Sequence, residues 1–325
     1  MDNFDLKKWS IIGHQKVIST LRNIILNQRI PHAFLFSGAS GIGKTLVAQN
    51  FINSIQCLSK ACPCGVCNSC KSIKNNTHPD IIYYDEGESL KIKDIRKLKH
   101  SLSLGSSVSP YKICLLGRIE RLTIEATNAL LKVLEEPSGK TIIILTTENH
   151  EKLLPTIVSR CVLFNFLLPA YQEIRNYFST YKTKKIESDL LERIILNSGN
   201  RPGIIFKYLG NKDKLEEIKN IEESFEKMLS NDNSYKKFDQ ATNLAKKEKF
   251  ELKEIFEVWK SYFRNIMFCK LELMQAKKNI FSEATLKRYS LQKISKNISE
   301  INKASILLSK NINKKLLIEN LVTNL

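Results

Sequence analysis

The chain has 325 residues, of which 42% are hydrophobic and 26% are charged, and this composition is typical of a soluble globular protein with two or three domains. Nowhere does it approach the roughly 18 uninterrupted apolar residues that a transmembrane helix needs, and its first ten residues lack the apolar segment of a secretory signal. We therefore expect a soluble, cytoplasmic protein. The formal net charge of +18 favours a polyanionic partner such as nucleic acid, although a general richness in Lys, Asn and Ile would give the same excess.

The first 167 residues alternate between two kinds of periodicity. Apolar residues at three- and four-residue spacing predict helices over 11–30, 45–57, 90–102 and 123–136. Short apolar runs predict strands over 33–37, 80–84, 112–116, 141–147 and 161–166. This alternation is typical of a parallel α/β sheet that is covered by helices on both faces. Beyond it, only helical patterns are found, and we expect a small helical domain over 168–211 and a longer one over 212–325.

A glycine-rich motif, GASGIGKT, follows the first predicted strand and opens a predicted helix. It fits G-x-x-x-x-G-K-[ST] in full, with Gly38, Gly41, Gly43, Lys44 and Thr45 as its key residues. In such loops the backbone N–H groups and the helix N-terminus face a phosphate chain, the lysine contacts the β and γ phosphates, and the hydroxyl holds Mg²⁺. The motif in this context predicts a site for ATP and Mg²⁺.

The acids that hydrolysis requires are missing from their expected place. In P-loop ATPases an Asp at the end of a neighbouring strand helps to hold Mg²⁺, and a further residue positions the attacking water. Here the strand over 112–116 is followed by Gly117 and Arg118, and Arg118 would oppose a bound cation. Glu120 is the nearest acid, and we expect it to point elsewhere. The sequence therefore predicts a site that binds nucleotide without hydrolysing it.

Five of the eight cysteines fall between residues 57 and 70. The cluster contains three thiols at the spacing C-x-x-C-x-x-C, namely Cys64, Cys67 and Cys70. Cys57 precedes them and is the natural fourth ligand, with Cys62 as its rival. Four thiolates suit a tetrahedral structural Zn²⁺ site that has no open position for catalysis. An unmetallated loop and a redox switch are the alternatives.

Several fragments together resemble one family, the clamp-loader ATPases of bacterial DNA polymerase III. The fragments are Ile12–Gln15, Pro31–Gly38, His78–Asp80, Asn128–Pro137 and Ser159–Cys161. They span residues 12–166, whereas the C-terminal half is similar only in length and helical character. The resemblance implies an AAA+ P-loop domain with a RecA-like parallel sheet over 1–167 and a zinc insertion at about 57–70. A small helical lid over 168–211 and an all-α oligomerisation (collar) domain over 212–325 would follow.

The resemblance also implies a role in DNA replication. Members form a hetero-pentamer of motor (gamma/tau), delta and delta-prime chains that opens the sliding clamp and places it on primed DNA. Chain length and the missing acids resemble the delta-prime type, a stator that belongs to the polymerase holoenzyme without being an active ATPase itself. Such a chain presents an arginine finger to its neighbour's ATP, and the matching residue is Arg160. Thr146 corresponds to a sensor of the γ-phosphate, with an ordinary strand-ending threonine as the alternative. Pro202 stands where motor subunits carry a second sensor arginine, with Arg201 one residue early.

Two other classes of function are compatible with parts of the sequence. The chain could be an enzyme, either a motor subunit of the gamma/tau kind or another DNA-remodelling AAA+ ATPase. It could also be a zinc-dependent DNA-binding factor, although no recognition helix flanks the cysteines. Gly117 and Arg118 discriminate between the stator and an active ATPase, because they replace the acids that hydrolysis requires, and they favour the stator.

Overall fold

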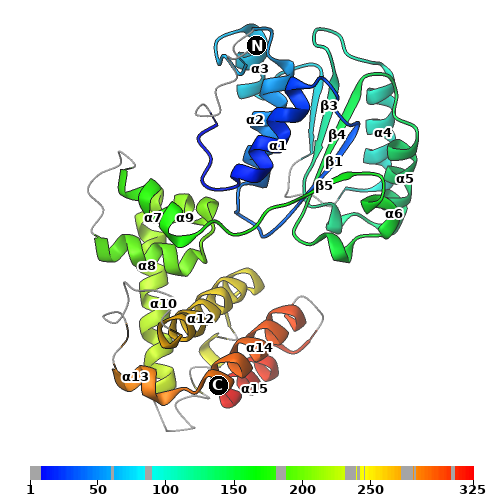
Figure 1. The fold of residues 1–325 in the computed structure, drawn as a ribbon. Helices are drawn as coiled ribbons and strands as arrows, with labels where there is room; N and C mark the ends of the chain where they lie inside the picture. The colour runs from blue at the N-terminus through cyan, green and yellow to red at the C-terminus, as the bar shows by residue number, and fades with distance from the viewer. Residues whose placement is uncertain are drawn as a thin grey trace. The chain divides into compact units, whose positions relative to one another are not determined.

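The computed structural model describes residues 9–59, 62–84, 90–180, 188–230, 239, 242–244, 246–271, 281, 283–308 and 312–325. The chain divides into two compact units (Figure 1). Unit 1 comprises Met1–Tyr181 together with Asn200–Gly203, and unit 2 comprises Lys182–Gly199 and Ile204–Leu325. Each unit has a hydrophobic core of its own.

Unit 1 is built on a five-stranded parallel sheet of order β2-β3-β4-β1-β5. The strands are β1 (Ala33–Ser37), β2 (Ile81–Tyr84), β3 (Lys112–Leu116), β4 (Thr141–Thr147) and β5 (Val162–Asn165). All the strands that the sequence predicts are present, so the predicted parallel α/β fold is confirmed. Because Ser37 pairs with Thr147 and Leu116 pairs with Leu145, the segments that follow β1, β3 and β4 leave the sheet at the same edge.

The three central strands, β1, β3 and β4, are buried on both faces, which explains why they read as continuous apolar runs. Phe34 and Phe36 of β1 pack on one face with α1 (Gln15–Leu26) and α2 (Lys44–Gln56). Ala33 and Leu35 point to the other face, where α4 (Ile92–Ser103) and α5 (Ile124–Glu135) cover them (Figure 1). The remaining elements of this unit are α3 (Asn68–Lys74), η2 (Ile119–Arg121), η3 (His150–Lys152), α6 (Pro155–Val158) and α7 (Tyr171–Thr180).

The described part of unit 2 is helical, as its sequence predicts. Its helices are α8 (Ser188–Ser198), α9 (Pro202–Leu209, whose first two residues belong to unit 1), α10 (Lys212–Ser230), α12 (Lys249–Lys270), α13 (Glu283–Arg288), α14 (Leu291–Leu307) and α15 (Lys314–Asn324). The core is rich in aromatic side chains, and Phe225 of α10 stacks on Trp259 of α12 with ring centroids 4.4 Å apart. Among the helices of the described ranges, none is long and apolar enough to cross a membrane. The expected separation of a lid over 168–211 from a collar over 212–325 stays a prediction.

Candidate nucleotide site and cysteine cluster

The glycine-rich motif forms the turn between β1 and α2. Gly38, Gly41 and Gly43 have φ angles of 155°, 76° and 111°, which residues other than glycine rarely adopt. A Cβ atom on Gly38 would also lie only 2.5 Å from the backbone oxygen of Phe166. The glycines thus allow the backbone to curl into a loop at the N-terminus of α2, the arrangement that binds phosphate in proteins of this kind.

A cavity of about 170 Å³ lies at this loop. Of the residues predicted for the nucleotide site, it is lined by Gly41, Gly43, Lys44, Thr45 and Thr146. The sixth, Gly38, is not among the lining residues, and its carbonyl oxygen accepts a hydrogen bond from Lys44. The structure therefore brings the predicted nucleotide residues together at one edge of the sheet.

Lys44 is held inside the loop. Its side chain is only 7% exposed, and Nζ donates hydrogen bonds to the carbonyl oxygens of Gly38 at 2.6 Å and Ala39 at 3.0 Å. A buried ammonium requires such acceptors, because losing its water shell is costly. The contacts keep the positive charge at the position where phosphate oxygens would meet it.

Arg118 occupies the end of β3, where an ATPase would carry its acids. Its backbone N–H donates to Oγ1 of Thr146 on β4 at 3.2 Å, and its guanidinium Nη2 donates to Oγ of Ser40 in the phosphate loop at 3.1 Å. The residue has a φ of 50°, in the left-handed region that is uncommon for a long side chain. Arg118 therefore lines the cavity together with Lys44, and sequence reasoning foresaw its charge but not its contact with the loop.

Acidic groups are scarce at the cavity. Among its described lining residues the only carboxylate is that of Glu148, an exposed side chain just beyond β4. Glu120 lies in η2 and does not line the cavity; its Oε2 is buried and lacks a hydrogen-bond partner within the described ranges. The pair of acids that positions Mg²⁺ and water in an ATPase is absent from the described cavity wall.

The segment 200–203 contacts the phosphate loop through its backbone. The N–H of Gly203 donates to the carbonyl oxygen of Gly41 at 2.8 Å, and a Cβ atom on Gly203 would lie 2.9 Å from that oxygen. Neither Arg201 nor Pro202 lines the cavity. The role of Gly203 was not foreseen from the sequence, since a lone glycine at the start of a helix gives no signal of which backbone approaches it.

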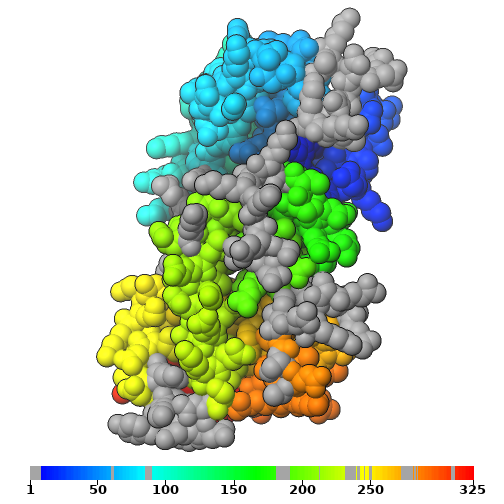
Figure 2. All heavy atoms as spheres, turned by 90° about the vertical axis from the view of Figure 1, so that its left-hand side faces the viewer, coloured from blue at the N-terminus to red at the C-terminus, as the bar shows by residue number. Residues whose placement is uncertain are grey.

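The cysteine cluster lies between α2 and α3. The Sγ atoms of Cys57, Cys64, Cys67 and Cys70 all lie within 4.8 Å of one another, and those of Cys64 and Cys70 are 4.0 Å apart. Zn–S bonds of about 2.3 Å in a tetrahedron place the sulfurs about 3.8 Å apart, so these four could hold a metal ion after a small contraction. Figure 2 shows the segment, in light blue, as part of the molecular surface.

Backbone N–H groups point at three of the four sulfurs. Cys64 N–H donates to Cys57 Sγ at 3.4 Å, Cys67 N–H to Cys64 Sγ at 3.3 Å, and Cys70 N–H to Cys67 Sγ at 3.4 Å. Hydrogen bonds from the N–H groups of Val66 and Cys67 lower the pKa of Cys64 to about 6. Donors aimed at sulfur stabilise thiolates, the form in which cysteine binds metal.

Cys62 is not among the four cysteines whose sulfurs all lie within 4.8 Å of one another. Its thiol donates to the carbonyl oxygen of Ser59 at 2.6 Å, and burial raises its pKa to about 12. Burial raises the pKa of Cys70 to about 12 as well, so what distinguishes Cys62 is its position outside the group of four sulfurs and its hydrogen bond to Ser59. The geometry thus favours Cys57 over Cys62 as the fourth ligand.

Arg160 lies just beyond α6 and precedes the edge strand β5, and it is not among the residues that line the cavity. Its guanidinium forms an ion pair with Glu135 of α5 at 2.7 Å and donates to the carbonyl oxygen of Thr156 at 2.9 Å. About a third of the side chain, 35%, is exposed. The residue is therefore accessible at the surface and does not serve this chain's own nucleotide site.

The motif His78-Pro79-Asp80 forms a buried polar network whose role the sequence did not reveal. Nδ1 of His78 accepts from the N–H of Asp80 at 3.1 Å, so the ring proton is on Nε2, which lies 3.2 Å from Oγ of Ser69 and 3.0 Å from Oγ of Ser109. Because Ser69 belongs to α3, the histidine links the cysteine segment to the sheet. Burial lowers the pKa of His78, which keeps the ring neutral.

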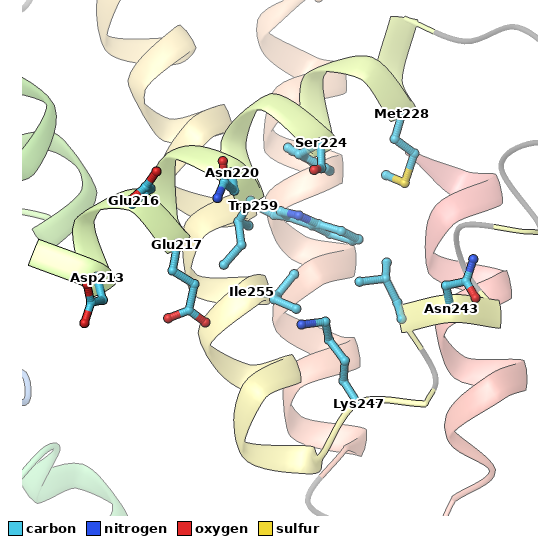
Figure 3. A pocket seen from close by; sticks show the side chains of 13 residues that line it. Asp213, Glu216, Glu217, Asn220, Ser224, Met228, Asn243, Lys247, Ile255 and Trp259 are labelled. Carbon is cyan, nitrogen blue, oxygen red and sulfur yellow. The ribbon is translucent and has the colours of Figure 1, made fainter.

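A larger cavity, of about 640 Å³, lies in unit 2 between α10 and α12 (Figure 3). Ile255 and Trp259 give it an apolar wall, and Glu216, Glu217 and Lys247 add charged groups. The described lining of this cavity contains neither a phosphate loop nor a cluster of metal ligands. The nucleotide chemistry predicted for the chain therefore belongs to unit 1.

Comparison with known proteins relates the first half of the chain to one family. The family described as "DNA polymerase III, delta subunit" matches residues 13–169. Residues 13–169 thus form a DNA polymerase III delta-type domain. This delta-type domain contains the phosphate loop, the cysteine cluster and Arg160. The predicted α/β fold, with a parallel sheet and a phosphate loop and with helical regions after it, is confirmed.

The curated relatives bear the names of different DNA polymerase III subunits. The DNA polymerase III subunit tau of Bacillus subtilis is 36% identical over 158 residues, 48% of this chain and 28% of that protein. The subunit delta' of the same organism is 37% identical over 153 residues, 46% of each chain. The alignments thus span half or less of these relatives. Among solved structures, a gamma subunit-related protein of Thermotoga maritima is similar with a TM-score of 0.47 and 20% identity, covering 94% of this chain and 97% of that one.

Proposed function

We propose that the chain is a clamp-loader subunit of DNA polymerase III and that it acts as the delta-prime type, or stator. The observation that carries this proposal is Arg118, which stands at the end of β3 and contacts the phosphate loop where an ATPase would hold Mg²⁺ with an acid. The delta-type domain over 13–169 and relatives named tau and delta' support the wider assignment. The chain would work in the cytoplasm at the replisome, with motor and delta subunits, the sliding clamp and primed DNA as partners.

In this proposal the chain's own nucleotide site binds ATP and does not turn it over. Lys44 and the backbone of the loop supply positive electrostatic potential for the phosphates, and Thr45 retains a hydroxyl for a cation. Activation of water would need a carboxylate close to the γ-phosphate. Glu148 is the one described carboxylate at the cavity, and its exposed position beyond β4 does not provide that function.

Arg160 would act on the ATP of a neighbouring motor subunit. A guanidinium beside a γ-phosphate offsets the charge that develops during phosphoryl transfer. To reach a partner, Arg160 must leave Glu135, and a partly exposed ion pair of this kind is worth only about 0–1 kcal/mol. The ion pair therefore orients the arginine without preventing its transfer to a phosphate.

Zinc would be the structural cofactor of the cysteine cluster, held by Cys57, Cys64, Cys67 and Cys70. Four thiolates complete the tetrahedral shell, so the ion would supply no catalytic chemistry. Since α3 contains Cys70 and begins directly after Cys67, and is tied to the sheet through Ser69 and His78, the ion would stabilise this corner of the delta-type domain.

Reconstitution tests the proposal. Arg160→Ala in this chain, assembled with motor and delta subunits, should leave assembly intact and lower the DNA-stimulated ATPase rate by 10-fold or more, since arginine fingers are worth about 10³–10⁵ in the strongest cases. Arg96→Ala, an exposed arginine on α4, is the matched control and should have no effect. An unchanged ATPase rate with Arg160→Ala would contradict the finger assignment.

A motor subunit is the second candidate, because the relative named tau is nearly as similar as the one named delta'. The two functions differ in turnover by the isolated chain. With MgATP the stator should bind nucleotide without sustained phosphate release. Sustained release that disappears in Lys44→Ala would establish the motor function instead.

A further inference from the structure

In the nucleotide site, the arginine side chain of Arg118 stands where P-loop ATPases carry the acid that helps to hold Mg²⁺. In P-loop proteins Mg²⁺ bridges the β and γ phosphates and is held by the loop hydroxyl and by an acid from the neighbouring strand. Here the hydroxyl of Thr45 remains, whereas the strand position holds Arg118. A guanidinium and a divalent cation a few ångströms apart repel each other.

Specific contacts and the backbone conformation hold the guanidinium of Arg118 at the loop. Its backbone N–H is fixed to Thr146, its Nη2 reaches Ser40, and its φ of 50° is a strained value for a residue with a Cβ atom. Strained residues of this kind persist where surrounding contacts over-determine them. Here those contacts aim a five-donor cation at the same small cavity that Lys44 lines.

The size of the cavity indicates which part of a ligand it selects. At about 170 Å³ it is smaller than the roughly 300–1,000 Å³ of typical small-molecule sites. It therefore fits the phosphate end of a nucleotide, with the nucleoside outside it. Its charged lining residues are Lys44, Arg118 and Glu148, and Glu148 is exposed at the rim.

We infer that Arg118 is a nucleotide ligand that takes the place of Mg²⁺, so that the site binds a nucleoside polyphosphate in its metal-free form. This inference rests on the proposed nucleotide site and goes beyond it. Arginine donates paired, charge-assisted hydrogen bonds to phosphate oxygens, and these would neutralise the charge that the metal otherwise shields. Because a guanidinium does not activate water, and the described cavity wall lacks the acids that would do so, bound nucleotide would remain intact.

Calorimetric titration of the full chain with ATP, in EDTA and in excess Mg²⁺, tests the inference. The wild-type chain should bind in EDTA at least as tightly as in Mg²⁺. Arg118→Asn removes the charge while tolerating the left-handed backbone, and should weaken binding in EDTA by about 10- to 100-fold. Arg118→Asp restores an acid and should reverse the preference, with Mg²⁺ tightening binding about tenfold or more. Thermal melting of both variants confirms that they fold.

Three outcomes would overturn the inference, and they are distinguishable. If Mg²⁺ tightens wild-type binding tenfold, and Glu148→Gln abolishes that gain, the site takes the metal through Glu148. If Arg118→Asn binds like the wild type in EDTA, the guanidinium is not a ligand. If ATP fails to bind in both buffers, the nucleotide part of the proposed function fails as well, whereas the role of Arg160 is judged separately by the reconstituted ATPase.

Discussion

Asp80 anchors a buried turn, and its neutralisation should destabilise unit 1 strongly. Its side chain is fully buried and accepts hydrogen bonds from the N–H groups of Ser107, Val108 and Ser109 at 2.7, 2.8 and 2.9 Å. It also forms an ion pair with Lys112, 3.4 Å away, whose side chain is only 10% exposed. Burial by itself would raise the pKa of Asp80, but the three N–H donors and Lys112 lower it, so the carboxylate is charged in the folded state.

Asp80→Asn keeps the size of the side chain and removes the charge. The amide can accept fewer of the three N–H groups, and Lys112 loses its buried partner. Removing one member of a buried ion pair costs about 3–5 kcal/mol, a large part of the roughly 5–15 kcal/mol that stabilises a domain. We therefore expect a loss of about 3–5 kcal/mol in the free energy of unfolding of unit 1.

Urea unfolding followed by tryptophan fluorescence measures this loss. The chain has two tryptophans, the buried Trp9 in unit 1 and Trp259 in unit 2, so a Trp259→Phe background leaves Trp9 as the reporter of the unit concerned. Glu151→Gln, which neutralises an exposed carboxylate in the same unit, should change stability by less than about 0.5 kcal/mol. A loss below about 1 kcal/mol for Asp80→Asn, at an unchanged denaturant slope, would refute the reasoning.

Three further predictions concern the same unit. Because burial lowers the pKa of His78 below its ordinary value of 6.5, the unfolded chain binds the proton first as pH falls, so stability should decline below about pH 6.5; urea titrations at pH 7.5 and 5.5 should show a smaller decline in His78→Gln. Cys57→Ser should abolish stoichiometric zinc, measured by mass spectrometry of the native protein, whereas Cys62→Ser should retain it; the reverse result would make Cys62 the fourth ligand. Gly38→Ala would bring a Cβ atom within 2.5 Å of the backbone oxygen of Phe166 and should lower the melting temperature and eliminate ATP binding, since the loop cannot keep its curl; a variant with normal binding would show that the loop tolerates another geometry.

Much of unit 1 could be predicted because its signals are local. Apolar runs of strand length placed all the strands, and the limits of β1, β3 and β4 were clearest because a strand that is buried on both faces has no polar alternation. The glycine spacing of the phosphate loop and the cysteine spacing of the cluster describe single short segments, whose chemistry depends on residues that are neighbours in sequence. The absence of acids directly after the strand over 112–116 could also be predicted, because it concerns residues that are adjacent in the sequence. Helix limits were less accurate: the helix expected over 11–30 is Gln15–Leu26, because Gly13 and His14 have positive φ angles before it begins.

Long-range pairings were decided by the tertiary structure alone. Nothing in the sequence relates Arg118 to Ser40, or Arg160 to Glu135, because each pair is joined only when the strands and helices of the sheet align. The choice of Cys57 over Cys62 depends on where each sulfur lies in the folded chain. In the sequence, both residues are cysteines that precede the triplet, and nothing separates them as ligands. Sequence thus determined which chemical groups the chain carries and which one it lacks. The fold decided that the arginine standing in place of the missing acid meets the phosphate loop, because parallel strands end at one edge of the sheet and bring the segments after β1 and β3 together there.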